Sequence, residues 1–250
     1  MTAAASCGSV SAPALGLPDA CAIPEAKGTL PKGMFAGKGP ISNTLRQHFV
    51  RDVASIHLLA LLRPANTGLA DGARIHEIMV LGLRMSGVDA TVPADVIEHI
   101  AAQRPNSGVL FVVVREGHTG ENAVGGGETH GKASEQCALA VRRRIPGRAG
   151  HVAQFAVHAS EWQDPRDILL EIEGASLDEA WESLCSQAIL GETTPADLDA
   201  RLLRRDRVKA LKAEEAKLAR DHGRAKNPAQ RNEIFAKLHK VRKELEALAQ

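Results

Sequence analysis

Three residues of this chain could supply the parts of a metal-dependent nuclease site. Such a site needs one acidic residue, then a second acid and a lysine on an adjoining strand, because together they hold a divalent cation and activate water. The nearest candidates are Glu77, Glu116 and Lys132, but no E-x-K pattern follows an acid at strand spacing. The pattern therefore favours the alternative in which Glu77 begins a strand and Glu116 follows one, without a catalytic role.

A second group of candidates lies in the polar stretch that follows Glu116. Gly125-Gly126-Gly127 could cradle a phosphate, but the stretch lacks the G-x-x-x-x-G-K-[ST] pattern and no clear helix follows it. His118 and His130 flank these glycines, and a metal ion would need a third ligand such as His151. Solvated histidines in a flexible loop are the simpler interpretation. The sequence thus predicts no catalytic residue, no metal site and no cofactor.

Basic residues gather in two places that could contact phosphate groups. Because successive strand residues point to opposite faces, only Arg142 and Arg144 of the Arg142-Arg143-Arg144 run share a side. Together with the C-terminal stretch, they give the candidate nucleic-acid contacts Arg142, Arg144, Arg204, Arg205, Lys209 and Lys212. Such contacts would be non-specific and sensitive to salt. In the alternative interpretation, the body arginines protect a strand end and the others form a solvated helical face.

Composition and charge narrow the class of protein. The 250 residues are 44% hydrophobic and 24% charged, which suits one sizeable globular core plus an appendage. Aromatic residues make up only 3%, with no Tyr, which disfavours platforms for base stacking. Residues 195–250 carry 15 Lys and Arg against 9 Asp and Glu, a net +6, and the remainder carries 16 against 21, a net −5. The opposite charges suggest that the two parts face different partners, but an ordinary solvated helical surface is the simpler interpretation of the excess.

The cysteine spacing and the N-terminal sequence indicate the cellular compartment in which the protein is expected. Cys7, Cys21, Cys137 and Cys185 are scattered, without the C-x-x-C spacing of a zinc or redox site. The N-terminus lacks the basic start and apolar run of a signal peptide, and no apolar run of about 18 residues could cross a membrane. The sequence therefore predicts a cytoplasmic protein with reduced cysteines and no membrane partner.

The hydrophobic pattern predicts an α/β body at residues 41–192, after a loosely ordered lead-in at residues 1–40 that is rich in Pro, Gly and Ala. The expected helices cover residues 42–62, 93–103 and 177–189, and the expected strands cover 75–85, 108–115, 136–143 and 152–159. The first two strands are apolar on both faces and are connected by a helix, which predicts that they pair in parallel. The last two alternate more cleanly, as antiparallel strands do. The expected fold is thus α/β (α+β), with a mixed four-stranded sheet and flanking helices.

Residues 195–250 predict a coiled-coil-like αα-hairpin, in which Pro228 ends the first helix and begins the second. Apolar residues three and four apart form a seam: Val208, Leu211, Leu218, Ile234, Leu238, Val241, Leu245 and Leu248. Glu215 and His222 interrupt the seam on the first arm, which leaves room for a partner helix. We therefore expect the seam to bind a protein partner. Pairing of two hairpins into a homodimer is the alternative.

Several short patches are similar to those of one protein family. In chain order they are Leu30-Pro31-Lys32-Gly33-Met34-Phe35, Glu77-Ile78, Val141-Arg142-Arg143, Leu177 to Trp181, and Asn232-Glu233-Ile234. On these patches the chain, from about Ile23 to its end, resembles the bacterial proteins catalogued as domain of unknown function 4391, as a divergent member with fewer aromatic residues. The resemblance implies a body followed by a hairpin, and an association with helicases and DNA methyltransferases of anti-phage defence systems. It implies no catalytic residue.

These observations together predict a non-enzymatic accessory or scaffolding subunit, which binds a protein partner through its C-terminal hairpin. The setting that the resemblance implies is an anti-phage defence or DNA-processing complex, with a helicase or a DNA methyltransferase as the partner. The alternative is a nucleic-acid-binding module or a cryptic metal-dependent nuclease. A salt series of nucleic-acid binding would separate the first alternative from protein docking, since phosphate contacts weaken steeply as salt rises.

Overall fold

The computed structural model describes four stretches of the chain, which are residues 3–37, 41–117, 134–147 and 152–249. These residues belong to two compact units, Met1–Ala196 and Asp197–Gln250. We call the first unit the body and the second unit the helix pair. Within the described stretches, no helix combines the length and the apolar character that a membrane span requires.

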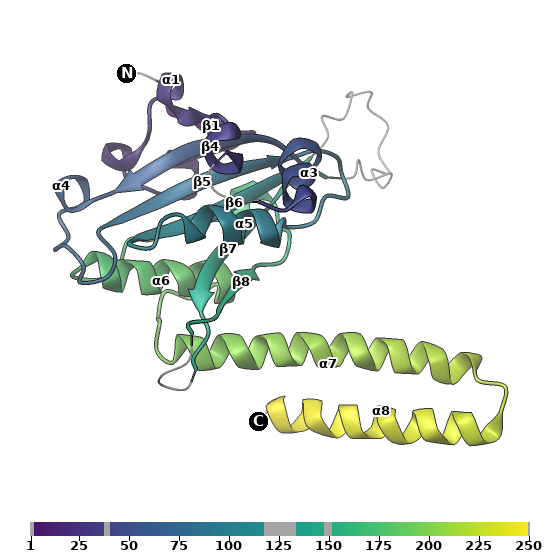
Figure 1. Cartoon of the computed structure of the whole chain (residues 1–250). Helices are drawn as coiled ribbons and strands as arrows, with labels where there is room; N and C mark the ends of the chain where they lie inside the picture. Colours follow the sequence, from purple (N-terminus) through teal and green to yellow (C-terminus); the bar gives the residue numbers. More distant parts are fainter. Residues whose placement is uncertain (1–2, 38–40, 118–133, 148–151, 250) are drawn as a thin grey trace, which may run out of the picture. The chain divides into compact units, whose positions relative to one another are not determined.

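The body is built on a six-stranded mixed sheet with the strand order β3-β4-β5-β6-β7-β8 (Figure 1). Its strands are β3 (Thr29–Leu30), β4 (Val53–Leu62), β5 (Glu77–Met85), β6 (Ser107–Glu116), β7 (Glu135–Arg144) and β8 (Phe155–Ala159). Only β5 and β6 run parallel, and every other neighbouring pair is antiparallel. The predicted mixed sheet, its parallel pair and its antiparallel last pair are confirmed. The predicted number of four strands is wrong, because β3 and β4 were not recognised.

Strand β4 explains the largest error of the sequence-based prediction. The expected helix over residues 42–62 is instead α3 (Asn43–Arg51) followed directly by β4. Register shifts between Val53 and Ser55 and between Leu58 and Ala60 mark bulges in β4. Each bulge adds a residue and reverses the strict alternation of faces. The buried positions of β4 therefore fall at spacings that imitate a helix.

Residues 3–37 are not the loose lead-in that their Pro and Gly content predicted. They form a series of short elements, which are β1 (Ser6–Cys7), β2 (Val10–Ser11), η1 (Pro13–Leu15), η2 (Asp19–Cys21), α1 (Glu25–Gly28), β3 and α2 (Gly33–Ala36). Side chains such as Cys7, Val10, Leu15 and Cys21 are fully buried. The segment is ordered because these apolar groups pack against the body, although the prolines keep each element short.

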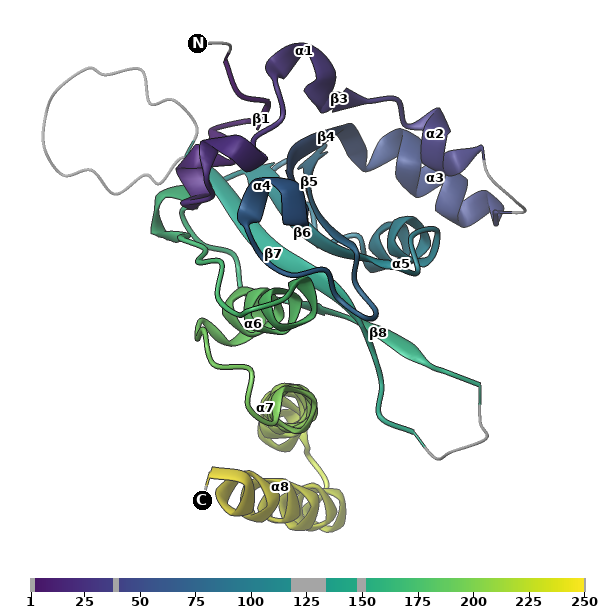
Figure 2. The ribbon, with the colours of Figure 1, turned by 90° about the vertical axis from the view of Figure 1, so that its left-hand side faces the viewer.

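Helices and the N-terminal segment cover the two faces of the sheet (Figure 2). On one face, α3 and α5 (Ala94–Ala102) pack against β5 and β6 in a cluster whose buried members include Leu81 of β5, Ile97 of α5 and Phe111 of β6. On the other face lie α6 (Leu177–Leu190) and residues of β1. Gly108 of β6 lets the Trp181 ring approach closely, since a Cβ there would lie 2.6 Å from the ring. Two short elements, α4 (Pro64–Thr67) and η3 (Pro165–Asp167), lie in the connections.

The helix pair consists of α7 (Leu198–Arg224) and α8 (Pro228–Ala249), which pack on each other along their length (Figure 1). The chain reverses over Ala225, Lys226 and Asn227, and the Asn227 side chain accepts a hydrogen bond from the Ala229 N–H at 2.9 Å. This bond satisfies a donor in the first turn of α8, where no preceding helical residue can do so. The predicted pair of C-terminal helices, with its break at Pro228, is confirmed.

Candidate functional site

The predicted seam lies within the helix pair. Leu211 of α7 and Leu238 and Val241 of α8 are buried. The other predicted seam residues, which are Val208, Leu218, Ile234, Leu245 and Leu248, are half-buried. Because α7 and α8 pack on each other, these apolar side chains hold the two helices together. Their role in binding a partner stays a prediction, and a partner that leaves the pair intact would meet its outer surface instead.

The polar interruptions of the seam are matched by residues of α8. Glu215 accepts a hydrogen bond from Arg242 Nε at 2.7 Å. The ring of His222 lies 6.0 Å from the ring of Phe235, centroid to centroid. Partly exposed ion pairs of this kind contribute little stability, at most about 1 kcal/mol. The two polar residues that interrupt the apolar spacing of the seam, Glu215 and His222, therefore already contact residues of α8.

Several basic candidates of the helix pair are engaged by its own residues. Arg204 donates from Nε to the backbone oxygen of Leu248 at 2.8 Å, and so caps a carbonyl in the last turn of α8. Arg205 lies 4.0 Å from the Asp206 carboxylate. Lys209 and Lys212 are exposed on α7. A phosphate contact by Arg204 would therefore require the loss of a helix cap.

The arginine run at the end of β7 is divided between the two faces of the sheet, as strand alternation predicts. Arg142 donates to Glu98 at 2.8 Å, and its guanidinium lies 3.5 Å from the centre of the Phe155 ring. Arg143 instead reaches Glu182 on α6 at 2.8 Å. Arg144, the last residue of β7, is exposed. Of the two body arginines proposed to contact phosphate, Arg142 is thus already held by an acid and an aromatic ring.

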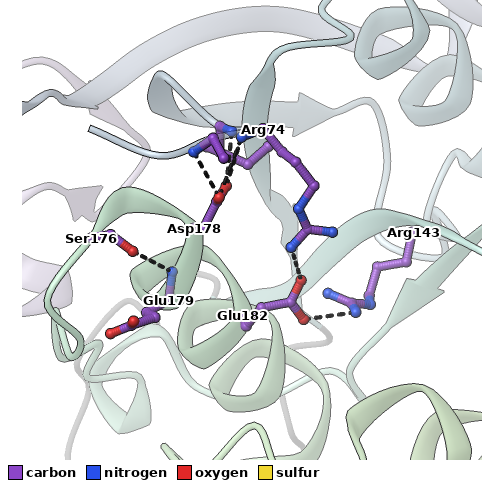
Figure 3. A network of polar contacts seen from close by, with 8 residues as sticks. Arg74, Arg143, Ser176, Asp178, Glu179 and Glu182 are labelled. Carbon is purple, nitrogen blue, oxygen red and sulfur yellow. Dashed lines mark hydrogen bonds and ion pairs between the residues drawn. The ribbon is translucent and has the colours of Figure 1, made fainter. Parts of the chain in front are cut away.

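A polar network that the sequence did not reveal joins α6 to the sheet (Figure 3). The Asp178 carboxylate accepts backbone N–H bonds from Ala73 at 2.8 Å, from Arg74 at 3.2 Å and from Ile75 at 2.9 Å. Partial burial raises the pKa of Asp178, but the three backbone donors outweigh it and hold that pKa below its usual value. Asp178 thereby fixes the loop that leads into β5.

The second part of this network is centred on Glu182, one turn further along α6 (Figure 3). Its two carboxylate oxygens meet Arg74 at 3.4 Å and Arg143 at 2.8 Å. The α6 helix is therefore tied to the loop before β5 and to β7 by charged groups from distant parts of the sequence. Arg74 and Glu182 are 108 residues apart and Arg143 and Glu182 are 39 apart, which explains why no spacing pattern indicated the network.

The two acidic candidates for a nuclease site, Glu77 and Glu116, are not brought together. Glu77 is the first residue of β5, where it pairs with Arg63 at 2.6 Å. Glu116 is the last residue of β6, and the parallel register places Glu77 beside Ser107 at the other end of that strand. At about 3.3 Å per residue, the two carboxylates lie roughly 30 Å apart along the sheet. They cannot share a metal ion.

The remaining chemistry candidates lie outside the described residues. These are Lys132, Gly125-Gly126-Gly127, His118, His130 and His151. Among the residues that are described, no three His, Cys, Asp or Glu side chains gather in a way that could hold a metal ion. Burial raises the pKa of both the Cys7 and the Cys137 thiols to about 12, so both are protonated at neutral pH and poor nucleophiles.

An open groove of about 640 Å³ lies at the carboxyl end of β5. Its sides come from the end of α3 and the start of α5, where His48 Nδ1 lies 2.5 Å from Asp95 Oδ2. Asp52 and Asp89 also line it, and none of its lining residues is Lys or Arg. The sequence did not indicate this groove, because the predicted long helix placed Asp52 in the middle of an element.

Comparison with known proteins places this geometry in a family. The family model described as Domain of unknown function (DUF4391) matches residues 15–245, which confirms the resemblance of the short sequence patches. Searches of the curated proteins and of the solved structures found no match. The matched residues include the whole sheet of the body and most of both helices of the pair. The chain therefore belongs to the family described as Domain of unknown function (DUF4391).

Proposed function

We propose that this protein is a non-enzymatic accessory or scaffolding subunit that binds a protein partner through the helix pair. The observation that carries the proposal is the form of that pair. It is a compact unit of two helices, and its longer helix of 27 residues extends about 40 Å at 1.5 Å per residue. Two long helices bury only a narrow stripe against each other and expose most of their surface. Such an element is well suited to displaying a surface to another protein.

The extent of the family match supports a functional role for the helix pair. The match continues to residue 245, close to the end of α8, so the helix pair is part of the family's layout. An appendage peculiar to this chain would have fallen outside the matched residues. The family's function is therefore expected to use the pair as well as the body.

The setting that we propose is an anti-phage defence or DNA-processing complex, with a helicase or a DNA methyltransferase as the partner. This partner class comes from the resemblance stated above. The net +6 charge of residues 195–250 is compatible with docking on an acidic protein surface.

Nucleic-acid binding is the second candidate, and the same net charge favours it. Arg142 and Arg204, however, already have intramolecular partners. A duplex titrated across a salt series would test this candidate. A steep loss of affinity with rising salt would support phosphate contacts, and absent binding at low salt would remove them.

Co-expression with the products of adjacent genes tests the protein-docking proposal. The full chain is expected to co-elute with a helicase or a methyltransferase in size-exclusion chromatography, whereas a chain ending at Ala196 elutes alone. All strands of the sheet lie before residue 197, and the shortened chain serves as the control once circular dichroism shows that it is folded. Co-elution of both chains would move the docking surface to the body. Sedimentation of the full chain alone would reveal the homodimer alternative.

A further inference from the structure

We infer that the turn end of the helix pair is its docking surface and that the partner presents an acidic surface with an apolar pocket. This inference rests on the proposed function and names the chemistry of the partner. We define the basic tip as Lys217, Arg220, Arg224, Lys226, Arg231 and Phe235. These residues come from the last two turns of α7, the connection and the first two turns of α8.

The five cations of the basic tip are exposed and lack intramolecular ion pairs with the described residues. Elsewhere in the helix pair, three cations form ion pairs with acids. Arg207 pairs with Glu244, Arg242 pairs with Glu215, and Lys237 pairs with Glu233. Residues 217–235 carry these five cations against two acids, Asp221 and Glu233, and this short segment thus holds a net +3 that an anionic surface could neutralise.

Helical spacing places these cations on a common surface. Lys217, Arg220 and Arg224 are three and four residues apart, which puts them along one side of α7. The contacts of Glu215 with Arg242 and of His222 with Phe235 fix the antiparallel register of the two helices. By that register, Arg220 is level with Lys237 and Arg224 is level with Glu233.

Local helix electrostatics explains only part of the basic tip. A cation in the last turn of a helix is favourable, which accounts for Arg224. Arg231 lies in the first turn of α8, where the helix dipole disfavours a cation and where no acidic residue is present. Arg220 and Arg224 also repel each other at a separation of four residues. A partner of negative charge would turn these unfavourable positions into favourable ones.

Phe235 decides between a protein and a nucleic acid as the occupant. Phe235 is 57% exposed and lies beside the ring of His222. A duplex backbone offers phosphates to the cations but no pocket for an isolated phenyl ring. Protein interfaces bury aromatic side chains at their centres and surround them with polar groups, and arginine is enriched there. A phenyl ring among five cations therefore favours an acidic protein surface.

Binding of the purified co-eluting protein to variants of the full chain tests the inference by isothermal titration calorimetry. The double variant Arg220→Glu/Arg231→Glu is expected to raise Kd at least 10-fold at low salt, and less at 0.5 M salt. Its matched control, Lys240→Glu/Lys243→Glu, reverses two exposed charges of α8 away from the tip and should change Kd less than 2-fold. Phe235→Ala should raise Kd at least 10-fold at both salt concentrations, and Phe235→Leu should restore part of the affinity. Circular dichroism confirms that each variant keeps its helices.

The outcomes separate the proposal that the helix pair binds the partner from the inference that its basic tip is the docking surface. If truncation at Ala196 abolishes binding but the tip variants bind like the full chain, docking through the pair stands and the basic tip is wrong. If the truncated chain binds fully, or no adjacent-gene product binds, both proposals fail. A 30-base-pair duplex is titrated in parallel. Loss of duplex binding by the tip variants, with unchanged protein binding, would assign the tip to nucleic acid and overturn the inference.

Discussion

At the scale of single residues, the polar groups of the body act by joining segments that are distant in the sequence. Asp178 binds three successive backbone N–H groups before β5, and Glu182 joins Arg74 to Arg143. Strand alternation predicted that Arg142 and Arg143 point to opposite faces. It could not predict Glu98 or Glu182 as their partners, because those acids lie on helices whose position depends on the tertiary fold.

Replacing Asp178 with Asn is expected to destabilise the body by about 1 to 2 kcal/mol. The amide presents one acceptor oxygen and carries no charge, whereas bonds to a charged acceptor contribute about 1.5 to 3 kcal/mol before exposure is considered. Urea unfolding followed by tryptophan fluorescence measures the loss. Asp19→Asn removes a similar charge at an exposed position and serves as the control. Equal stability of the two variants would contradict an anchoring role for Asp178.

The stability of the body is also expected to fall in acid. Partial burial raises the pKa values of Asp178 and Glu135, but hydrogen bonds outweigh it and hold both below their usual values. A carboxylate whose pKa is depressed by folding adds stability above its unfolded pKa of about 4, and loses it as pH falls through the folded value. Urea midpoints between pH 6 and pH 3 should therefore decrease, and less steeply for Asp178→Asn. Parallel curves for the two proteins would refute the contribution of Asp178.

At the scale of elements, the sequence predicted those strands and helices whose apolar residues recur at a regular spacing. Strands β5 to β8 and helices α5 and α6 follow regular patterns and were found near their expected positions. Strand β4 was missed because two bulges disturb its alternation, and β3 was missed because two residues carry no period. The prolines before Gly33 suggested disorder, whereas burial of neighbouring apolar side chains orders the segment. Tertiary packing overrides local propensity at these places.

Substitution of Gly108 with Ala tests the close contact between β6 and α6. The added Cβ would lie 2.6 Å from the Trp181 ring, so we expect overpacking to cost about 1 to 3 kcal/mol. Thermal unfolding should shift downward by roughly 2 to 4 °C per kcal/mol for a unit of this size. Gly33→Ala, with no atom within 4 Å of its new Cβ, is the matched control. An unchanged midpoint for Gly108→Ala would show that α6 packs less closely.

The buried seam also leads to a prediction for the stability of the helix pair. Leu238 is buried, and its replacement by Ala should destabilise the pair by about 2 to 3 kcal/mol through a cavity that cannot fully close. Hydrogen exchange should accelerate in residues 198–249 and remain unchanged in the sheet, because Leu238 belongs to the second of the two compact units. Leu203→Ala removes a leucine that is 47% exposed and should have little effect. Faster exchange throughout the body after Leu238→Ala would contradict this independence.

At the scale of the whole molecule, two units of opposite net charge belong to one family match. The spacing of apolar residues predicted which side chains would be buried in the helix pair. It could not predict the basic tip, because that surface depends on which cations find acids across the pair and which do not. Glu77 and Glu116 have side chains suited to a nuclease site, but the structure places them at opposite ends of the parallel strands. We therefore expect this protein to act by docking.

The most direct test of that account is a titration of the co-eluting helicase or methyltransferase into the full chain and into a chain ending at Ala196. We predict micromolar or tighter binding by the full chain and no measurable binding by the shortened chain, with the body still folded by circular dichroism. Equal affinities of the two chains would contradict the central claim that the helix pair binds the partner.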